Sequence, residues 1–354
     1  MNFDLSDKYF ELKKNWFHLF TTLIIGLIGS VIFVSITLPL PWLLGALFTT
    51  TFASMLGQKI WIPSWLRLIS LVVLGALFGT AVSDSFLNDL IEWLPSIIAV
   101  TSYVLLVIPP TMFYLVRVVK LDLITAYFSS APGGLLPMTF IGSEMGGDAK
   151  IISLIQSSRI ILTVLIIPIA YTIFAGYNPT GEIGSGGSFS SLDPLSGLTL
   201  LGVSILGFFI ARPLKIPTPA LMGPMISVSI MSLTGFTSAE VPDSLVAIAQ
   251  CLIGSSIGAM FNNIRPRTVA RIFFHGSVAS VYMIIFAVGA AIVTFYLTGI
   301  PTRSLILAFA PGGFAEMALV GFALGIDVAF VVAHQLSRYF FVILVLPIIF
   351  KKLK

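Results

Sequence analysis

The sequence predicts an all-α integral membrane protein built from two inverted repeats of about five spans each, and three observations lead to this fold class. First, the 354 residues are 57% hydrophobic and only 10% charged, whereas a soluble domain carries about a quarter charged residues. Second, several apolar stretches reach the roughly 20 residues that a membrane-crossing helix needs. Third, the segment APGGLLPM, which begins at Ala131, has a near copy, APGGFAEM, which begins at Ala310.

The longest apolar stretches are predicted to be membrane-spanning helices. They are Leu19–Leu38, Leu94–Val116, Ile151–Ala175, Ile272–Leu297 and Val328–Phe350. Residues 1–18 are polar and of mixed charge, and no small-residue cleavage site follows the first stretch. We therefore expect a cytoplasmic N-terminal segment over 1–18 and a retained first span, not a cleaved signal peptide. The single Cys251 excludes an internal disulfide and a cysteine metal cluster.

The two APGG segments belong to a longer repeat. Residues 131–168 align without a gap with residues 310–347, and thirteen of the thirty-eight positions are identical. Apolar composition alone would match leucine with leucine, but it would not match polar residues in register. The positions that matter below are Pro132, Gly133, Gly134, Asp148, Gln156, Ser158 and Arg159, which face Pro311, Gly312, Gly313, Asp327, Gln335, Ser337 and Arg338. We expect membrane repeat 1 over 19–175, an external Gly/Ser-rich linker over 176–196 and membrane repeat 2 over 197–354.

Loop charge predicts that the repeats face opposite ways, because basic loops stay in the cytoplasm. A loop with Lys59 and Arg67 in the first repeat corresponds to a loop with Glu240 and Asp243 in the second. The next loop is acidic in the first repeat and basic in the second, with Asp84, Asp89 and Glu92 facing Arg265, Arg267 and Arg271. Opposite orientation requires an odd number of crossings per repeat, so each APGG segment should enter and leave on one side. The prediction is ten full spans, two re-entrant segments and cytoplasmic termini; the alternative is twelve spans in parallel repeats.

The two breaks are the candidate binding site. Proline and paired glycines interrupt a helix, and irregular backbone at membrane depth is tolerated only inside protein or beside a wet cavity. One break alone would read equally well as a plain kink. Two breaks at matching places of inverted repeats are typical of a transporter site at mid-membrane. We therefore predict substrate contacts from Pro132–Gly134 and from Pro311–Gly313.

Polar residues on the following helices suggest the charge of the substrate. Arg159 and Arg338 each lie about ten residues into an apolar helix, where an arginine is costly unless it faces protein or water. Gln156 and Gln335 precede them by three residues, so each pair shares a helix face. Together with the adjacent Ser158 and Ser337, and with the free N–H groups of broken helices, they predict an anionic substrate such as a carboxylate. The alternative is that both arginines snorkel to the interface.

Three carboxylates are candidates for ion coupling. Glu316 lies inside the second broken segment, where the first repeat has Pro137, and an isolated carboxylate there suggests coupling to H⁺ or Na⁺, or pairing with an arginine. Asp148 and Asp327 each open a helix, so N-capping is the favoured interpretation and ion coupling the alternative. No metal-ligand pattern and no nucleotide-binding P-loop appears, so we expect neither a cofactor nor an enzyme activity.

At these residues the sequence resembles a bacterial family of duplicated membrane proteins, the AbrB-type family. The resemblance rests on PWLLGA, on APGGLLPMTFIGSEMGGDAKIISLIQSSRI and on APGGFAEMALVGFALGIDVAFVVAHQLSR, and it covers nearly the whole chain. Members are labelled as transcriptional regulators or as ammonia monooxygenases, and the resemblance implies both labels. The layout is also similar to the cation/anion-antiporter superfamily, which implies five-plus-five inverted repeats with crossed broken helices.

The residues of this chain argue against both labels in a literal sense. A copper monooxygenase needs a histidine-rich metal site, whereas His18, His275 and His334 are far apart in the sequence. A DNA-binding regulator needs a basic nucleic-acid face, and the few basic residues here lie in short loops. We therefore expect no nucleic-acid partner, and an effect on gene expression would be indirect.

The function we expect is secondary transport of a small, anionic solute across the bacterial cytoplasmic membrane by alternating access. The alternative from a different class is a membrane-embedded sensor that binds a solute without moving it. A channel is less favoured, because no ring of like charges or filter motif is present. The expected partners are the solute and the lipid bilayer, and the sequence leaves a homo-oligomer open.

Overall fold

The structure is a computed structural model that describes residues 5–38, 40–82, 86–175, 194–216, 218–234, 240–261 and 266–353. Within these ranges all regular structure is helical, which confirms the all-α class. The helices are α1 (Leu5–Ser35), α2 (Pro41–Met55), α3 (Ser64–Thr80), α4 (Phe86–Glu92), α5 (Leu94–Arg117), α6 (Leu123–Ser130), α7 (Leu135–Glu144), α8 (Ala149–Ala175), α9 (Pro194–Ala211), α10 (Pro219–Leu233), α11 (Asp243–Gly258), the short 3₁₀ helix η2 (Ala259–Phe261), α12 (Pro266–Thr298), α13 (Thr302–Phe309), α14 (Phe314–Ala323) and α15 (Val328–Leu353).

Six of these helices are long and apolar enough to cross a membrane, which confirms the predicted membrane class. They lie in α1, α5, α8, α9, α12 and α15, and the apolar helices α3, α10, α11 and α14 are shorter, at 10–17 residues. Four of the five apolar stretches singled out above fall wholly within one of the long helices, and Leu19–Leu38 extends three residues beyond the end of α1. In the N-terminal segment 1–18 the described residues are helical, because α1 begins at Leu5; its cytoplasmic placement stays a prediction. Polar residues therefore extend the first span as one continuous helix. The total of ten spans stays a prediction.

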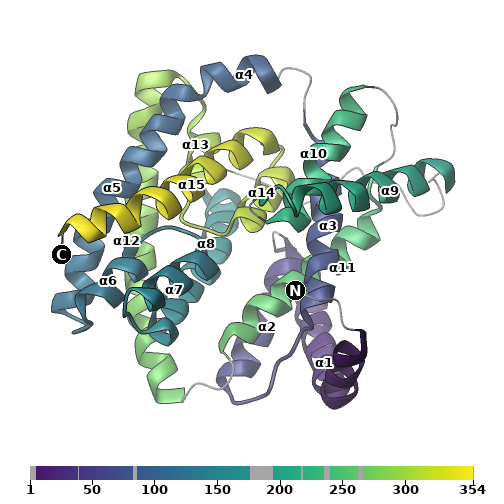
Figure 1. Ribbon diagram of the computed structural model, residues 1–354, viewed down its shortest axis with the longest axis horizontal. Helices are drawn as coiled ribbons and strands as arrows, with labels where there is room; N and C mark the ends of the chain where they lie inside the picture. The colour runs from purple at the N-terminus through teal and green to yellow at the C-terminus, as the bar shows by residue number, and fades with distance from the viewer. Residues whose placement is uncertain are drawn as a thin grey trace. The chain divides into compact units, whose positions relative to one another are not determined.

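The chain folds into two compact units that do not coincide with the two sequence repeats. The first unit contains Met1–Thr80 and Asn178–Pro266, and the second contains Ala81–Tyr177 and Arg267–Lys354. Each unit therefore takes helices from both repeats. In the first unit α2 packs on α1 and α11, and α10 packs on α9 and α3 (Figure 1). The predicted linker lies mostly outside the described residues, which resume at Pro194.

Glycine pairs bring helices of the first unit into backbone contact, and they do so in the same way in both repeats. A Cβ on Gly45 of α2 would lie 2.3 Å from the carbonyl oxygen of Gly29 in α1, and a Cβ on Gly223 of α10 would lie 2.4 Å from that of Gly207 in α9. Small residues allow such close approach in membrane proteins, where packing replaces the hydrophobic effect. Equivalent pairs of helices are therefore built by equivalent residues.

The same contacts include a matched pair of side-chain hydrogen bonds. The Thr49 hydroxyl of α2 donates to the Ile25 carbonyl of α1 at 3.0 Å. The Ser227 hydroxyl of α10 donates to the Val203 carbonyl of α9, also at 3.0 Å. Hydroxyl-to-carbonyl bonds of this kind join neighbouring helices in an apolar medium. They place α1 against α2 and α9 against α10 in corresponding registers.

In the second unit, the first broken segment turns back on itself. α6 begins after Asp122, whose side chain accepts a hydrogen bond of 2.9 Å from the Thr125 N–H. Beyond the end of α7, the Asp148 N–H donates to the Thr125 hydroxyl at 2.8 Å. The start of α8 therefore returns to the start of α6, and α6, α7 and α8 lie together in Figure 1.

Two tyrosines form hydrogen bonds between helices of the second unit that are far apart in the sequence. The Tyr127 hydroxyl, in the middle of α6, donates to the Leu346 carbonyl in the C-terminal half of α15 at 2.9 Å. The Tyr171 hydroxyl, near the end of α8, donates to the Arg303 carbonyl at the start of α13. A buried tyrosine hydroxyl needs a partner, and these two meet that need across elements far apart in the sequence.

Candidate functional site

Each APGG segment is a short, extended break between two half-helices. α6 ends at Ser130 and α7 begins at Leu135, while α13 ends at Phe309 and α14 begins at Phe314. The backbone is extended at Ala131 (φ −74°, ψ 123°) and at Gly134 (φ −69°, ψ 142°), and it has the same form in the second break. The proline and first glycine of both breaks are buried. The irregular backbone thus lies inside protein, as a lipid environment requires.

Gln156 and Arg159 of α8 hold the first break by its carbonyl oxygens. The Gln156 amide donates to Phe128 at 2.8 Å and to Ala131 at 3.0 Å. The Arg159 guanidinium donates to Ala131 at 2.9 Å and to Gly133 at 2.6 Å. The last carbonyls of a helix lack partners within the helix and carry partial negative charge. The side chains of α8 supply both the missing donors and the opposite charge.

Gln335 and Arg338 of α15 hold the second break in the same way. The Gln335 amide donates to Leu307 at 2.9 Å and to Ala310 at 3.3 Å. The Arg338 guanidinium donates to Ala310 and, at 3.2 Å, to Gly312. Each acceptor corresponds to one in the first break, so the sequence repeat extends to individual hydrogen bonds.

Both arginines are buried at the breaks and do not extend toward the helix ends. Arg159 is 2% exposed and Arg338 is 4% exposed. Their guanidinium groups donate hydrogen bonds to backbone carbonyls of the breaks. They do not reach the membrane interface, as the snorkelling alternative would require. The structure shows that both arginines brace the backbone of the breaks, and their contact with a substrate stays a prediction.

The two breaks differ in what they leave unsatisfied. In the second, the Arg338 guanidinium also donates to the Gln335 side-chain oxygen. In the first, Arg159 Nε and Gln156 Oε1 are buried and have no hydrogen-bond partner among the described residues. Buried polar atoms without partners are uncommon and each needs an explanation. One donor and one acceptor are therefore available beside the first break.

A second difference lies at the start of α14. Gly134 and Gly313 are the N-cap residues of α7 and α14, so neither has a side chain to cap its helix. A Cβ on Gly313 would collide with the Glu316 carboxylate. Pro137 occupies the corresponding position after Gly134. The second repeat thus brings its own carboxylate to the N-terminal end of α14, whereas the first repeat brings none to α7.

Sequence reasoning missed Tyr103 of α5. This tyrosine is 2% exposed. Its ring lies edge-on to Phe309, with centroids 5.7 Å apart, and its hydroxyl donates to the Met283 carbonyl of α12 at 3.1 Å. Tyr103 thus packs on Phe309, the last residue before the second break. The repeat offset of 179 residues leads from Tyr103 to Tyr282, and that match was a usable signal.

The predicted serines lie elsewhere. The Ser158 hydroxyl donates to the Ile155 carbonyl of its own helix at 2.8 Å, and a Cβ on Gly276 of α12 would collide with that hydroxyl. The Ser337 hydroxyl donates to Ala333 at 2.8 Å. Neither hydrogen bond involves a break, so Ser158 and Ser337 stay predictions as substrate contacts.

His334 and the two aspartates have structural partners. The His334 ring is fully buried and forms hydrogen bonds with the Ser96 hydroxyl at 2.7 Å and the Phe330 carbonyl at 2.8 Å. Asp148 accepts from the Lys150 N–H and Asp327 from the Ala329 N–H, both at 2.8 Å. Both aspartates therefore cap the helices they open, as the favoured interpretation expected. Their role in ion coupling stays a prediction.

The described residues contain no group of three or more His, Cys, Asp or Glu side chains that could hold a metal ion. The polar groups that lie at the breaks are amide, guanidinium and backbone groups. Such groups bind and orient a solute by hydrogen bonding.

Nearly the whole chain is similar to one family profile and to two known bacterial proteins. The sequence profile of a family described as "Transition state regulatory protein AbrB" matches residues 42–354. The chain is 29% identical to the protein YhjN of Bacillus subtilis (strain 168), over 95% of this chain and 92% of that protein. It is 23% identical to "Putative regulator AbrB" of Escherichia coli (strain K12), over 92% of this chain and 93% of that protein.

Proposed function

Because the chain belongs to the AbrB family, whose profile here coincides with an all-α membrane fold, we propose that it is a secondary transporter of a small anionic solute. The solute binds beside the first break, and movement of the surrounding helices exposes it alternately to the two sides of the bacterial cytoplasmic membrane. The proposal assigns no catalytic step to the chain.

The observation that carries the proposal is the difference between the two breaks. Arg338 closes on Gln335, whereas Arg159 Nε and Gln156 Oε1 have no partner among the described residues. A buried donor and acceptor left unpaired cost roughly 1–3 kcal/mol each. An anionic solute that accepts from Arg159 and donates to Gln156, such as the carboxylate form of a hydroxy acid, would recover this free energy.

The helix ends support a negative charge on the solute. Backbone N–H groups at a helix N-terminus attract anions. Glu316 stands near the start of α14 and meets that need within the protein. Pro137 leaves the start of α7 without such a group, so a carboxylate of the solute is the natural counterpart there. Glu316 is then the candidate for H⁺ or Na⁺ coupling, because it is a carboxylate in a membrane-embedded segment.

Contacts in the second unit support the inverted topology. The start of α8 returns to Thr125 at the start of α6, as a re-entrant segment requires. The middle of α6 contacts the C-terminal half of α15 through Tyr127 and Leu346, which lies 18 residues after the first residue of that helix. This contact supports a start of α15 at the end of the unit opposite to the start of α8, which is what inverted repeats require. The proposed topology has ten spans, two re-entrant segments and cytoplasmic termini, and the contacts bear only on the re-entrant first segment and on the direction of α15.

Cysteine labelling tests the topology. The buried Cys251 is first replaced by serine, and Ser188→Cys or Arg267→Cys is then introduced as the single cysteine of the chain. In intact cells a membrane-impermeant maleimide is expected to label Ser188→Cys and not Arg267→Cys, because basic loops stay inside. Opening the cells should make both sites reactive. Equal labelling in intact cells would favour the twelve-span parallel model.

Solute binding is tested with acetate, lactate, succinate and citrate, because a bound ligand raises apparent stability. At least one is expected to raise the melting temperature of the purified protein. Gln156→Leu and Gln335→Leu serve as a matched pair, since both remove a brace from a break but only Gln156 has an unpaired atom. Gln156→Leu should weaken binding about tenfold or more, and Gln335→Leu should change it little. Equal effects of the two substitutions would contradict the site assignment.

A membrane-embedded sensor is the second candidate, because the family description and one relative's name both refer to regulation. Transport and sensing share the binding site and differ in flux. Proteoliposomes loaded with the carboxylate that binds are expected to take up its radiolabelled form by counterflow. Binding without counterflow would favour the sensor.

A further inference from the structure

A second site is present between α5 and α12, two long membrane-spanning helices of the second unit. They enclose a pocket of about 440 Å³, which is lined by Pro110, Thr111, Phe113, Tyr114, Val278, Ala279 and Tyr282. Its lining is almost entirely apolar. The Thr111 hydroxyl is occupied within its own helix, since it donates to the Val107 carbonyl at 2.7 Å. The pocket therefore suits an apolar occupant.

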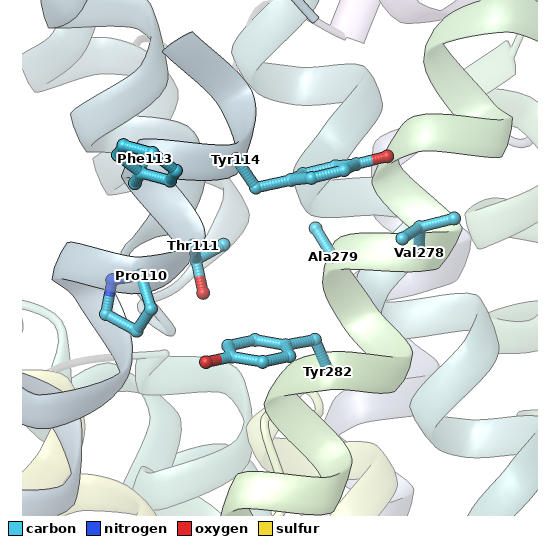
Figure 2. Close-up of a pocket in the computed structure, with 7 residues that line it drawn as sticks. All are labelled: Pro110, Thr111, Phe113, Tyr114, Val278, Ala279 and Tyr282. Atoms are coloured by element: carbon cyan, nitrogen blue, oxygen red, sulfur yellow. The ribbon is translucent and has the colours of Figure 1, made fainter. Parts of the chain in front are cut away.

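Two tyrosines form the ends of this pocket. Figure 2 shows Tyr114 reaching from α5 toward α12 at one end, and Tyr282 reaching from α12 toward α5 at the other. Thr111 and Ala279 lie between them, and their small side chains leave the space open. The Tyr114 hydroxyl and His275 Nδ1 form a hydrogen bond of 2.9 Å, which fixes this end. The result is a slot between two helices.

The slot is accessible from the face of the helices that meets lipid. Phe113 and Val278, which line it, are 63% and 38% exposed. Phe274, one turn before Val278 on α12, is 63% exposed. Large apolar side chains exposed on membrane-spanning helices face the hydrocarbon of the bilayer. An alkyl chain of a lipid can therefore reach the slot sideways.

Two contacts show that α5 and α12 run in opposite directions. The Tyr103 hydroxyl bonds to the Met283 carbonyl, and the Tyr114 hydroxyl bonds to His275. A step forward along α5 thus corresponds to a step backward along α12. The C-terminal end of α5 and the N-terminal end of α12 therefore lie at the same end of the slot.

That end is basic. Arg117 lies three residues beyond Tyr114, and its guanidinium stands over the ring of Phe113, 5.9 Å from the centroid. Arg271 lies four residues before His275, on the face that also holds Val278 and Tyr282. Both arginines are about one helical turn, or roughly 5 Å, past the Tyr114–His275 contact. Both are exposed, and so is Lys120 just beyond α5.

We propose that the slot between α5 and α12 binds an anionic phospholipid, with an alkyl chain between Tyr114 and Tyr282 and the phosphate headgroup at Arg117 and Arg271. Basic pockets between membrane helices are suited to anionic headgroups. The one carboxylate close in sequence, Asp122, already accepts the Thr125 N–H. The basic end suits a negatively charged phosphate headgroup, and the apolar slot behind it suits an alkyl chain. An anionic phospholipid has both parts. This inference does not depend on the proposed transport function.

The test measures phosphatidylglycerol binding to the purified protein by native mass spectrometry, with phosphatidylcholine as the neutral comparison. Phosphatidylglycerol is expected to bind at least tenfold more tightly. Each arginine near an anionic lipid contributes roughly a fivefold factor, so Arg117→Gln combined with Arg271→Gln should weaken binding about 25-fold. Both positions are exposed, so the fold should be retained.

The slot itself is tested with two matched substitutions on α12. Val278→Trp places a large ring at the lining of the slot, whereas Val293→Trp adds the same ring at a position that is 60% exposed and outside the lining. Only Val278→Trp should reduce phosphatidylglycerol binding, by about fivefold or more. The proposal is overturned if phosphatidylcholine binds equally well, if both tryptophan variants bind like the original protein, or if chain-free glycerophosphoglycerol binds as tightly as the lipid.

Discussion

Replacing Arg159 by alanine is expected to abolish solute counterflow and to lower the free energy of unfolding by roughly 3–5 kcal/mol. The Gly133 carbonyl would lose its 2.6 Å hydrogen bond from the guanidinium, and a large buried volume would be left empty. The break would then lose the donor that holds it inside protein. Denaturant unfolding of the detergent-purified protein measures the change in stability, and counterflow in proteoliposomes measures the change in function.

Two further substitutions make this result specific. Lys150→Ala removes an exposed positive charge from the same helix and should leave stability and counterflow nearly unchanged. Arg159→Lys keeps the charge but not the two-pronged geometry that reaches both Ala131 and Gly133, so it should recover little. Arg338→Ala is expected to act like Arg159→Ala, because Arg338 binds the second break in the same way. If Arg159→Ala and Arg338→Ala both leave counterflow unchanged, the breaks are not the transport site.

Replacing Gly207 by alanine is expected to destabilise the first unit by about 2–3 kcal/mol. The added Cβ would lie 2.4 Å from the Gly223 carbonyl oxygen, which is backbone and cannot rotate away. α9 and α10 would have to separate, and the Ser227–Val203 hydrogen bond between them would be stretched. The melting temperature of the purified protein should fall accordingly.

Gly202→Ala is the matched control for this prediction. Gly202 lies on the same helix α9, and a Cβ there would meet nothing within 4 Å. Its replacement should be neutral or slightly stabilising, because alanine favours the helix. Gly45→Ala probes the equivalent contact between α2 and α1 and should be as damaging as Gly207→Ala. If Gly207→Ala leaves the melting temperature unchanged, α9 and α10 are not packed as closely as described.

The repeat was the most informative sequence feature. The offset of 179 residues matches glutamine, arginine and aspartate residues of the two repeats and so predicted pairs of equivalent residues. In the structure, the paired residues form equivalent hydrogen bonds. Gln156 and Gln335, for example, reach acceptors that correspond one to one. Capping by Asp148 and Asp327 was also predictable. Each aspartate stands directly before a helix, where its side chain can accept from the N–H groups of the first turn.

The partners of these residues were not predictable. Charge and spacing predicted that Arg159 and Arg338 contact an anionic substrate, whereas the acceptors that the structure shows are backbone carbonyls of the breaks. The repeat match with Tyr282 could have singled out Tyr103, but no local pattern reveals its distant contacts with Phe309 and Met283. The slot between α5 and α12 likewise depends on side chains from helices that are far apart in the chain.

The sequence by itself determined the membrane environment, the long helices, the duplicated breaks and the residues that repeat with them. These follow from composition, apolar length and local chemistry, which act within short stretches of chain. Only the tertiary structure decided that each compact unit combines helices of both repeats, that the arginines brace the breaks, and that one break retains an unpaired donor and acceptor. Those features depend on which backbone carbonyls and side chains meet across long sequence separations, and no local pattern encodes that choice.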